Sequence, residues 1–173
     1  MRPVVMAGPM AVGKSTVARK VASCSDSVLL SFGDLVRAEA QRRSLNGDRA
    51  TLQGVGQELH ARLGPRGLSE ALLKRRRSGV VIEGVRHVDV LKALRELLPN
   101  LVMAYLTAPP AVLDERWALR GTTNPRDKAT RHQLESELNL LRDHASIVID
   151  TAQISAEVAA EMILVAARSA TTT

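Results

Sequence analysis

The segment from Gly8 to Ser15 constrains the fold of this chain more than any other feature of the sequence. It reads Gly-Pro-Met-Ala-Val-Gly-Lys-Ser and matches the phosphate-binding pattern G-x-x-x-x-G-K-[ST] at every fixed position. The glycines let backbone N–H groups approach an anion closely, and a helix that follows directs its positive end toward the same point. The pattern therefore predicts a cradle for the phosphates of a nucleotide.

The residues of this cradle predict a site for ATP and Mg²⁺. We expect Lys14 to reach the β- and γ-phosphates, and the hydroxyl of Ser15 to ligate the Mg²⁺ that bridges them. Thr16 supplies a second hydroxyl next to it. The predicted nucleotide-binding residues are Gly8, Pro9, Met10, Ala11, Val12, Gly13, Lys14, Ser15 and Thr16.

The sequence on either side of the motif supports this prediction. A short apolar run over residues 3–7 precedes it and predicts a buried parallel strand. Small and apolar residues then recur with the spacing of a helix that packs on a sheet, namely Val17, Ala18, Val21 and Ala22. Strand, loop and helix thus occur in the order that the motif requires.

Four more short apolar runs, at residues 28–31, 79–84, 101–106 and 146–150, predict further strands. Helical patterns separate them, and no internal repeat is present. Alternating strands and helices of this kind favour a three-layer α/β/α domain with a mostly parallel, five-stranded sheet. Because the chain has 173 residues, we expect a single domain over residues 1–173.

Composition narrows the classes of partner. The chain is 45% hydrophobic, but its only aromatic residues are Phe32, Tyr105 and Trp117, which argues against base stacking on a nucleic acid. A formal net charge of +6 favours anionic partners, although the one basic run, Lys74 to Arg77, is typical of an exposed helix end. Nucleic acid is therefore not the favoured partner.

The sequence also limits where the protein is expected to act. Its single cysteine, Cys24, excludes an intramolecular disulfide and fits a reducing compartment. We expect that side chain to be buried near the end of the first helix. No run of about eighteen apolar residues predicts a membrane span. These features favour a cytoplasmic protein without a membrane partner, and they leave the oligomeric state open.

The segment from Ser31 to Arg37 resembles a known family. It reads Ser-Phe-Gly-Asp-Leu-Val-Arg, similar to the Ser-Thr-Gly-Asp-Leu-Leu-Arg of adenylate kinase-type nucleoside monophosphate kinases. This resemblance implies the strand order 2-3-1-4-5, a helical acceptor-binding region at about residues 34–78, and a role for Arg37 in holding the acceptor phosphate. Phe32 replaces a hydroxyl residue of the family, so it packs either on an acceptor base or in the core. The segment at residues 52–59 resembles the corresponding segment in the deoxynucleotide kinase branch of the family.

A second segment with a predicted function ends the apolar run at residues 79–84. Its acid, Glu83, occupies the place of a Walker B carboxylate and is expected to hold Mg²⁺ or its water shell. Arg86 resembles the arginine that grips the acceptor phosphate in the family, at the spacing found in dephospho-coenzyme A kinase-like relatives. His87 beside it is expected to cap a helix.

The helix opened by Pro109 and Pro110 carries two arginines four residues apart, Arg116 and Arg120. Like charges at this spacing repel, which favours an anion nearby. The alternative is that the neighbouring Asp114 and Glu115 neutralise them. By resemblance, they are the lid-edge arginines that stack on the donor base and contact its phosphates. The resemblance also implies a short lid at about residues 116–132, with Arg126 or Arg131 as further cations. The lid has no cysteine cluster, so no structural zinc is expected.

These observations lead to one main hypothesis and two alternatives. The main hypothesis is an ATP- and Mg²⁺-dependent phosphotransferase whose acceptor is a nucleoside or deoxynucleoside monophosphate. Such an acceptor is already ionised, so Lys14, Arg37, Arg86, Arg116 and Arg120 would suffice without a general base. The first alternative is a kinase for a hydroxyl acceptor, such as dephospho-coenzyme A, with Asp34 as the general base. The second is an ATPase that acts on RNA or a protein partner.

Overall fold

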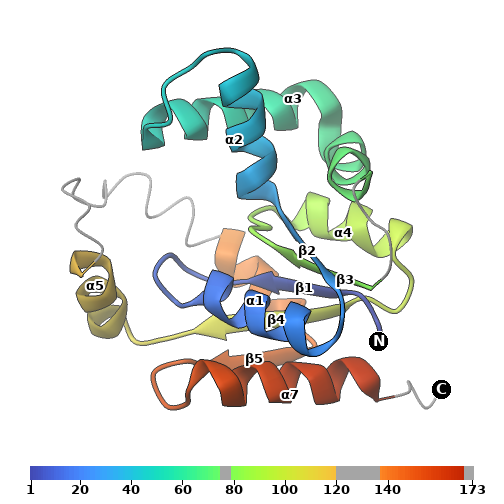
Figure 1. Ribbon diagram of the computed structural model, residues 1–173, viewed down its shortest axis with the longest axis vertical. Coiled ribbons are helices and arrows are strands. Elements are labelled where there is room, and N and C mark those ends of the chain that lie inside the picture. Colours follow the sequence, from blue (N-terminus) through green and yellow to red (C-terminus); the bar gives the residue numbers. More distant parts are fainter. Residues whose placement is uncertain (75–78, 120–136, 170–173) are drawn as a thin grey trace.

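The computed structural model describes residues 1–74, 79–119 and 137–169 (Figure 1). Its centre is one parallel sheet with the strand order β2-β3-β1-β4-β5, so the predicted fold and strand order are confirmed. The strands are β1 (Val4–Ala7), β2 (Val28–Ser31), β3 (Val80–Glu83), β4 (Val102–Thr107) and β5 (Ile147–Asp150). The helices are α1 (Lys14–Cys24), α2 (Phe32–Arg42), α3 (Arg49–Leu73), α4 (Val88–Leu97), α5 (Pro110–Ala118) and α7 (Ala156–Arg168).

The register of the sheet brings the carboxyl ends of its strands together. β1 lies between β3 and β4, with Met6 opposite both Glu83 and Ala104. At the two outer pairs, Ser31 is opposite Glu83, and Thr107 is opposite Asp150. Since ligands of open α/β sheets bind outside the carboxyl ends of the strands, this edge positions the candidate site.

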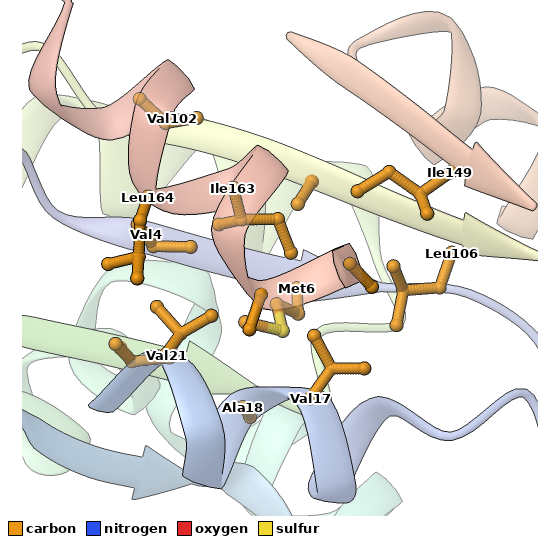
Figure 2. Close-up of a cluster of buried hydrophobic side chains, with 14 of the residues drawn as sticks. Val4, Met6, Val17, Ala18, Val21, Val102, Leu106, Ile149, Ile163 and Leu164 are labelled. Atoms are coloured by element: carbon orange, nitrogen blue, oxygen red, sulfur yellow. The ribbon is translucent and has the colours of Figure 1, made fainter. Parts of the chain in front are cut away.

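The side chains of β1 alternate between two aliphatic cores, because successive residues of a strand point to opposite faces. Val4 and Met6 are fully buried with side chains of α1 and α7 on one face, as Figure 2 shows. Val5 is fully buried on the other face, among residues of α3 and α4. Each such burial stabilises the fold by roughly 1.5–3 kcal/mol, so the sheet is held firmly from both sides.

Helices α2 and α3 form a lobe that rises from the carboxyl end of β2 (Figure 1). Ser31 caps α2 by accepting a hydrogen bond from Asp34 N at 3.4 Å, and Asp48 caps α3 by accepting one from Thr51 N at 3.0 Å. α3 is kinked at residues 64–65, where Gly64 has a φ of 65° before Pro65. We call α2 and α3 together the α2–α3 lobe.

α2 begins at Phe32 because Ser31 provides the cap, so Asp34 lies in the first turn. Two local predictions differ from the structure. Cys24 is exposed rather than buried, since it is the last residue of α1 and that helix buries another face. His87 precedes α4 as expected, but its side chain makes no capping hydrogen bond.

Some predictions lie outside the described residues. These are the basic run beyond Lys74 and most of the lid, with Arg120, Arg126 and Arg131. Across the described ranges, no helix combines the length and apolar character needed to cross a membrane.

Candidate nucleotide-binding site

The phosphate loop joins β1 to α1 and needs both of its motif glycines. Gly8 has a φ of 142°, and a Cβ added to it would lie 2.2 Å from the carbonyl oxygen of Leu106. Gly13 has a φ of 95° and precedes α1, in the left-handed region that glycine favours. Because the first turn of α1 has no acidic residue and no side-chain cap, its N-terminal N–H groups are suited to an anion.

The ammonium of Lys14 lies against the loop itself. Its Nζ donates to the carbonyl oxygens of Gly8 at 2.9 Å and Pro9 at 2.6 Å. These bonds hold the charge beside the cradle and are of a kind that phosphate oxygens can replace with stronger, charge-assisted ones. Lys14 therefore lies beside the cradle, and its contact with phosphates stays a prediction.

The hydroxyl of Ser15 and the carboxylate of Glu83 meet at the foot of the loop. Ser15 Oγ donates to Glu83 Oε2 at 2.8 Å, although 68 residues separate them in sequence. Mg²⁺ prefers oxygen ligands and is usually held by one or two protein groups together with phosphates and water. This pair fits that requirement, and no group of three or more metal-ligating side chains occurs in the described part of the chain.

A groove of about 430 Å³ runs beside the loop, between α5 and the segment that follows β5. Its walls include Val12 of the loop, Arg116 and Leu119, and, after β5, Thr151 and Ile154. A groove that combines apolar walls with a guanidinium and adjoins the phosphate cradle is suited to a nucleobase and its sugar.

A chain of hydrogen bonds fixes Arg116 to this groove. Its Nη1 donates to Thr151 Oγ1 at 3.0 Å, and its Nη2 donates to the Thr151 carbonyl oxygen at 2.7 Å. The buried Thr151 hydroxyl in turn donates to the Val12 carbonyl oxygen at 2.9 Å. Arg116 is thus bound to the phosphate loop through one threonine. The sequence analysis did not identify this anchor, since nothing in the sequence relates Thr151 to residue 116.

On the other side of the loop, Asp34 and Arg37 form an exposed ion pair in the first turns of α2, with 2.5 Å between Asp34 Oδ1 and Arg37 Nη2. The segments that follow β2 and β3 lie close together, because a Cβ added to Gly84 would lie 3.6 Å from Gly33 N. Phe32 is buried in the core, which decides between its two predicted environments.

Arg86 follows β3 in this part of the site, within electrostatic range of a second arginine, Arg49. The side chain retains contact with solvent, but the bulk of the surrounding protein, together with repulsion from Arg49, lowers the pKa of Arg86 below its ordinary value. Arg49 is not among the residues predicted from the sequence. The sequence held one indication of its role. A cation as the first residue of a helix opposes the helix dipole, so it is unfavourable unless an anion lies nearby.

Comparisons with known proteins agree with this geometry. A family model described as an AAA domain matches residues 7–135. A UPF0200 protein from Pyrobaculum aerophilum is 32% identical over 123 residues, which cover 70% of this chain and 67% of the relative. The adenylate kinase of Prochlorococcus marinus is 30% identical over 135 residues, which cover 74% of each chain.

The fold also occurs among solved structures. The shikimate kinase of Acinetobacter baumannii, solved with shikimate, is 19% identical with a TM-score of 0.65, and the match covers 95% of this chain and 91% of that one. The chain therefore belongs to the AAA-domain family of P-loop proteins that the sequence model matches. The predicted resemblance to P-loop kinases of the adenylate kinase group is confirmed.

Proposed function

We propose that this protein is an ATP- and Mg²⁺-dependent kinase that transfers the γ-phosphoryl group to the phosphate of a nucleoside or deoxynucleoside monophosphate. The observation that carries the proposal is the placement of cations on both sides of one phosphate loop. Arg116 lines the groove, Lys14 lies against the loop itself, and Arg37 and Arg86 follow the neighbouring strands β2 and β3. A site with two anionic substrates requires this distribution of charge.

The donor half of the site would act by positioning. The groove would hold the base, with Arg116 kept in place by Thr151, while the loop N–H groups and Lys14 would bind the β- and γ-phosphates. Ser15 and Glu83 would hold Mg²⁺, which neutralises charge on the phosphate oxygens when it is bound.

The acceptor half would supply charge rather than a base. A phosphate acceptor is already ionised, so no side chain has to remove a proton from it. Asp34 instead orients the guanidinium of Arg37 through their ion pair, and Arg86 would bind the acceptor phosphate from β3. We further propose that residues 1–173 act as one domain in the cytoplasm, with a lid at about residues 116–132.

One observation favours a second candidate, a kinase with a hydroxyl acceptor. The carboxylate of Asp34 is 63% exposed at the edge of the site, where it could accept a proton from a bound hydroxyl. The shikimate kinase with the same fold binds a small molecule that is not a nucleotide. The variant Asp34→Asn separates the two: a phosphate-acceptor enzyme keeps its turnover within about tenfold, whereas a hydroxyl kinase loses roughly 10²–10⁴-fold.

A coupled ADP-release assay tests the proposed function. The panel contains ribo- and deoxynucleoside monophosphates, dephospho-coenzyme A and shikimate, each with Mg²⁺ and ATP. We expect turnover with at least one monophosphate, and a kcat that is about 10²–10³-fold lower in the variant Lys14→Met. Turnover with only the hydroxyl acceptors would replace the main proposal with the second candidate. ADP release that is independent of every acceptor would point to an ATPase.

A further inference from the structure

Arg49, the first residue of α3, connects three parts of the molecule. Its Nη2 lies 3.1 Å from Met10 Sδ in the phosphate loop. Its guanidinium carbon lies 5.1 Å from the ring centroid of Trp117 in α5. A single side chain of the α2–α3 lobe thus contacts both the cradle and the helix that carries Arg116.

The partners of Arg49 are unusual for an arginine of this lobe. Every other described arginine between residues 32 and 73 forms an ion pair with a carboxylate; these are Arg37, Arg42, Arg43, Arg62 and Arg66. Arg49 instead contacts a thioether, which is a weak acceptor, and the face of an aromatic ring. Among the described residues, its guanidinium has no anionic partner.

A second positive charge lies near Arg49. Repulsion from Arg49 contributes to lowering the pKa of Arg86, and Arg86 too forms no ion pair with any described carboxylate. The carboxylate of Asp48, which precedes Arg49, caps α3 through Thr51 rather than pairing with Arg49. Two guanidinium groups whose charges repel are stabilised when an anion binds near both of them.

We propose that Arg49 is a phosphate-binding residue that acts with Arg86 as a clamp. In the bound state, Arg49 would move away from the Trp117 ring and bind a phosphoryl group next to Met10. This inference rests on the proposed function, and it adds a residue of the α2–α3 lobe to the site. The planar guanidinium presents several N–H donors that match phosphate oxygens. Because Met10 belongs to the loop, the bound group belongs to the phosphates of either the donor or the acceptor.

Occupancy of this clamp would couple the two halves of the site. A phosphate that binds Arg49 and Arg86 joins the start of α3 to the end of β3. At the same time it removes the contact between Arg49 and α5. Binding of substrate would therefore change the environment of Trp117 without any chemical step.

The protein carries its own probe for this movement, because Trp117 is the only tryptophan in the chain. The experiment measures tryptophan emission of the full-length protein during separate titrations with Mg²⁺–ATP, AMP and inorganic phosphate. The variants are Arg49→Gln, Arg49→Lys and the matched control Arg42→Gln, an exposed arginine of the same lobe that pairs with Glu39. Circular dichroism and thermal unfolding establish that each variant is folded.

In the unaltered protein and in Arg42→Gln, we expect a saturable change in emission with inorganic phosphate and with at least one nucleotide. Arg49→Gln should lose the phosphate-induced change and bind that nucleotide about tenfold more weakly, as removal of one charged hydrogen-bond donor implies. Arg49→Lys should retain part of the affinity. A response to ATP alone assigns the clamp to the donor phosphates, and a response to AMP alone assigns it to the acceptor.

The proposal is overturned if calorimetry shows nucleotide binding that is equally tight in Arg49→Gln and in Arg42→Gln, with the same emission change. The clamp and the proposed function can fail separately. If phosphate and ATP move Trp117 through Arg49 but no monophosphate is phosphorylated, the clamp stands and the proposed reaction is wrong. If a monophosphate is phosphorylated and Arg49→Gln leaves its kcat, KM and emission unchanged, the clamp is wrong.

Discussion

Arginines of the α2–α3 lobe occur in two different settings. Toward the end of α2, in what we call the outer setting, Glu39 receives hydrogen bonds from Arg42 at 2.8 Å and from Arg43 at 2.7 Å. Arg43 also reaches Glu58 of α3 at 2.6 Å, which connects the two helices. Next to the phosphate loop, in what we call the inner setting, Arg49 lies near Arg86, and neither has a carboxylate partner within the described residues.

The difference shows how one type of side chain can serve structure or binding. A carboxylate that is part of the chain neutralises an arginine permanently and orders the helices it connects. An arginine without such a partner lowers the stability of the unliganded protein, and binding of an anion to it stabilises the fold. The arginines therefore fall into two groups, one paired with carboxylates and one available to bind an anion. The predictions below test this division.

The largest effect is expected for Lys14→Met, which removes the cation of the phosphate loop. Since Lys14 would contact the phosphates whose charge changes most during transfer, we expect kcat to fall about 10²–10³-fold. Stability should change little, because the bonds of Lys14 to Gly8 and Pro9 join residues of the same loop. Steady-state kinetics and thermal unfolding measure the two quantities, and an unchanged kcat would exclude the loop from phosphate binding.

Arg86→Gln tests the inner setting and should separate activity from stability. We expect kcat/KM for the acceptor to fall by about ten- to a hundredfold, as loss of a charged contact implies. Thermal stability should stay the same or rise, because the repulsion between Arg86 and Arg49 is removed. A lower Tm with unchanged kcat/KM would place Arg86 with the structural arginines of the outer setting.

Much of this site could be predicted from sequence because its information is local. The phosphate loop is a contiguous motif, and five apolar runs separated by helical patterns were enough for the α/β class. The positions of Arg37, Glu83 and Arg86 follow from their place at or beyond the carboxyl ends of strands, since parallel strands bring these ends to one edge. The strand order came from the family resemblance, since spacing alone does not set the order of parallel strands.

The remaining features depend on contacts between distant segments. Thr151 anchors Arg116 across 35 residues, and Arg49 reaches Met10 across 39. Neither pairing has a sequence pattern, because each is set by how the lobe and the last strand pack on the sheet. The exposure of Cys24 was predicted wrongly for a similar reason, since the buried face of α1 could not be followed reliably to its last residue.

Arg43→Gln tests the outer setting and should give the reverse of Arg86→Gln. It removes the hydrogen bonds that Arg43 donates to Glu39 and Glu58, so the contact between α2 and α3 weakens. We expect a lower Tm, with kcat/KM within about threefold of the unaltered protein because surface changes away from a site rarely affect it more. Arg62→Gln is a suitable control, since its distance to Glu39 is longer, at 3.5 Å. A large loss of kcat/KM with normal stability would instead show that Arg43 contributes to substrate binding.

The smallest expected effect is the dependence of the outer setting on pH. Hydrogen bonds from Arg42 and Arg43 lower the pKa of Glu39 from 4.5 to about 2. Because the folded pKa is lowered, this carboxylate stabilises the fold above about pH 4.5 and loses that contribution as the pH falls toward about 2. Denaturant unfolding between pH 7 and pH 2 measures this loss, and Glu39→Gln should reduce it. Glu157, whose pKa the hydrogen bond from Lys20 also lowers to about 2, provides the comparison, because Glu157→Gln alters α1 and α7 but not the lobe. If Glu39→Gln leaves the acid dependence of stability unchanged while Glu157→Gln reduces it, the ion pairs of Glu39 contribute nothing to the stability of the fold. The arginines of the outer setting would then have no structural role.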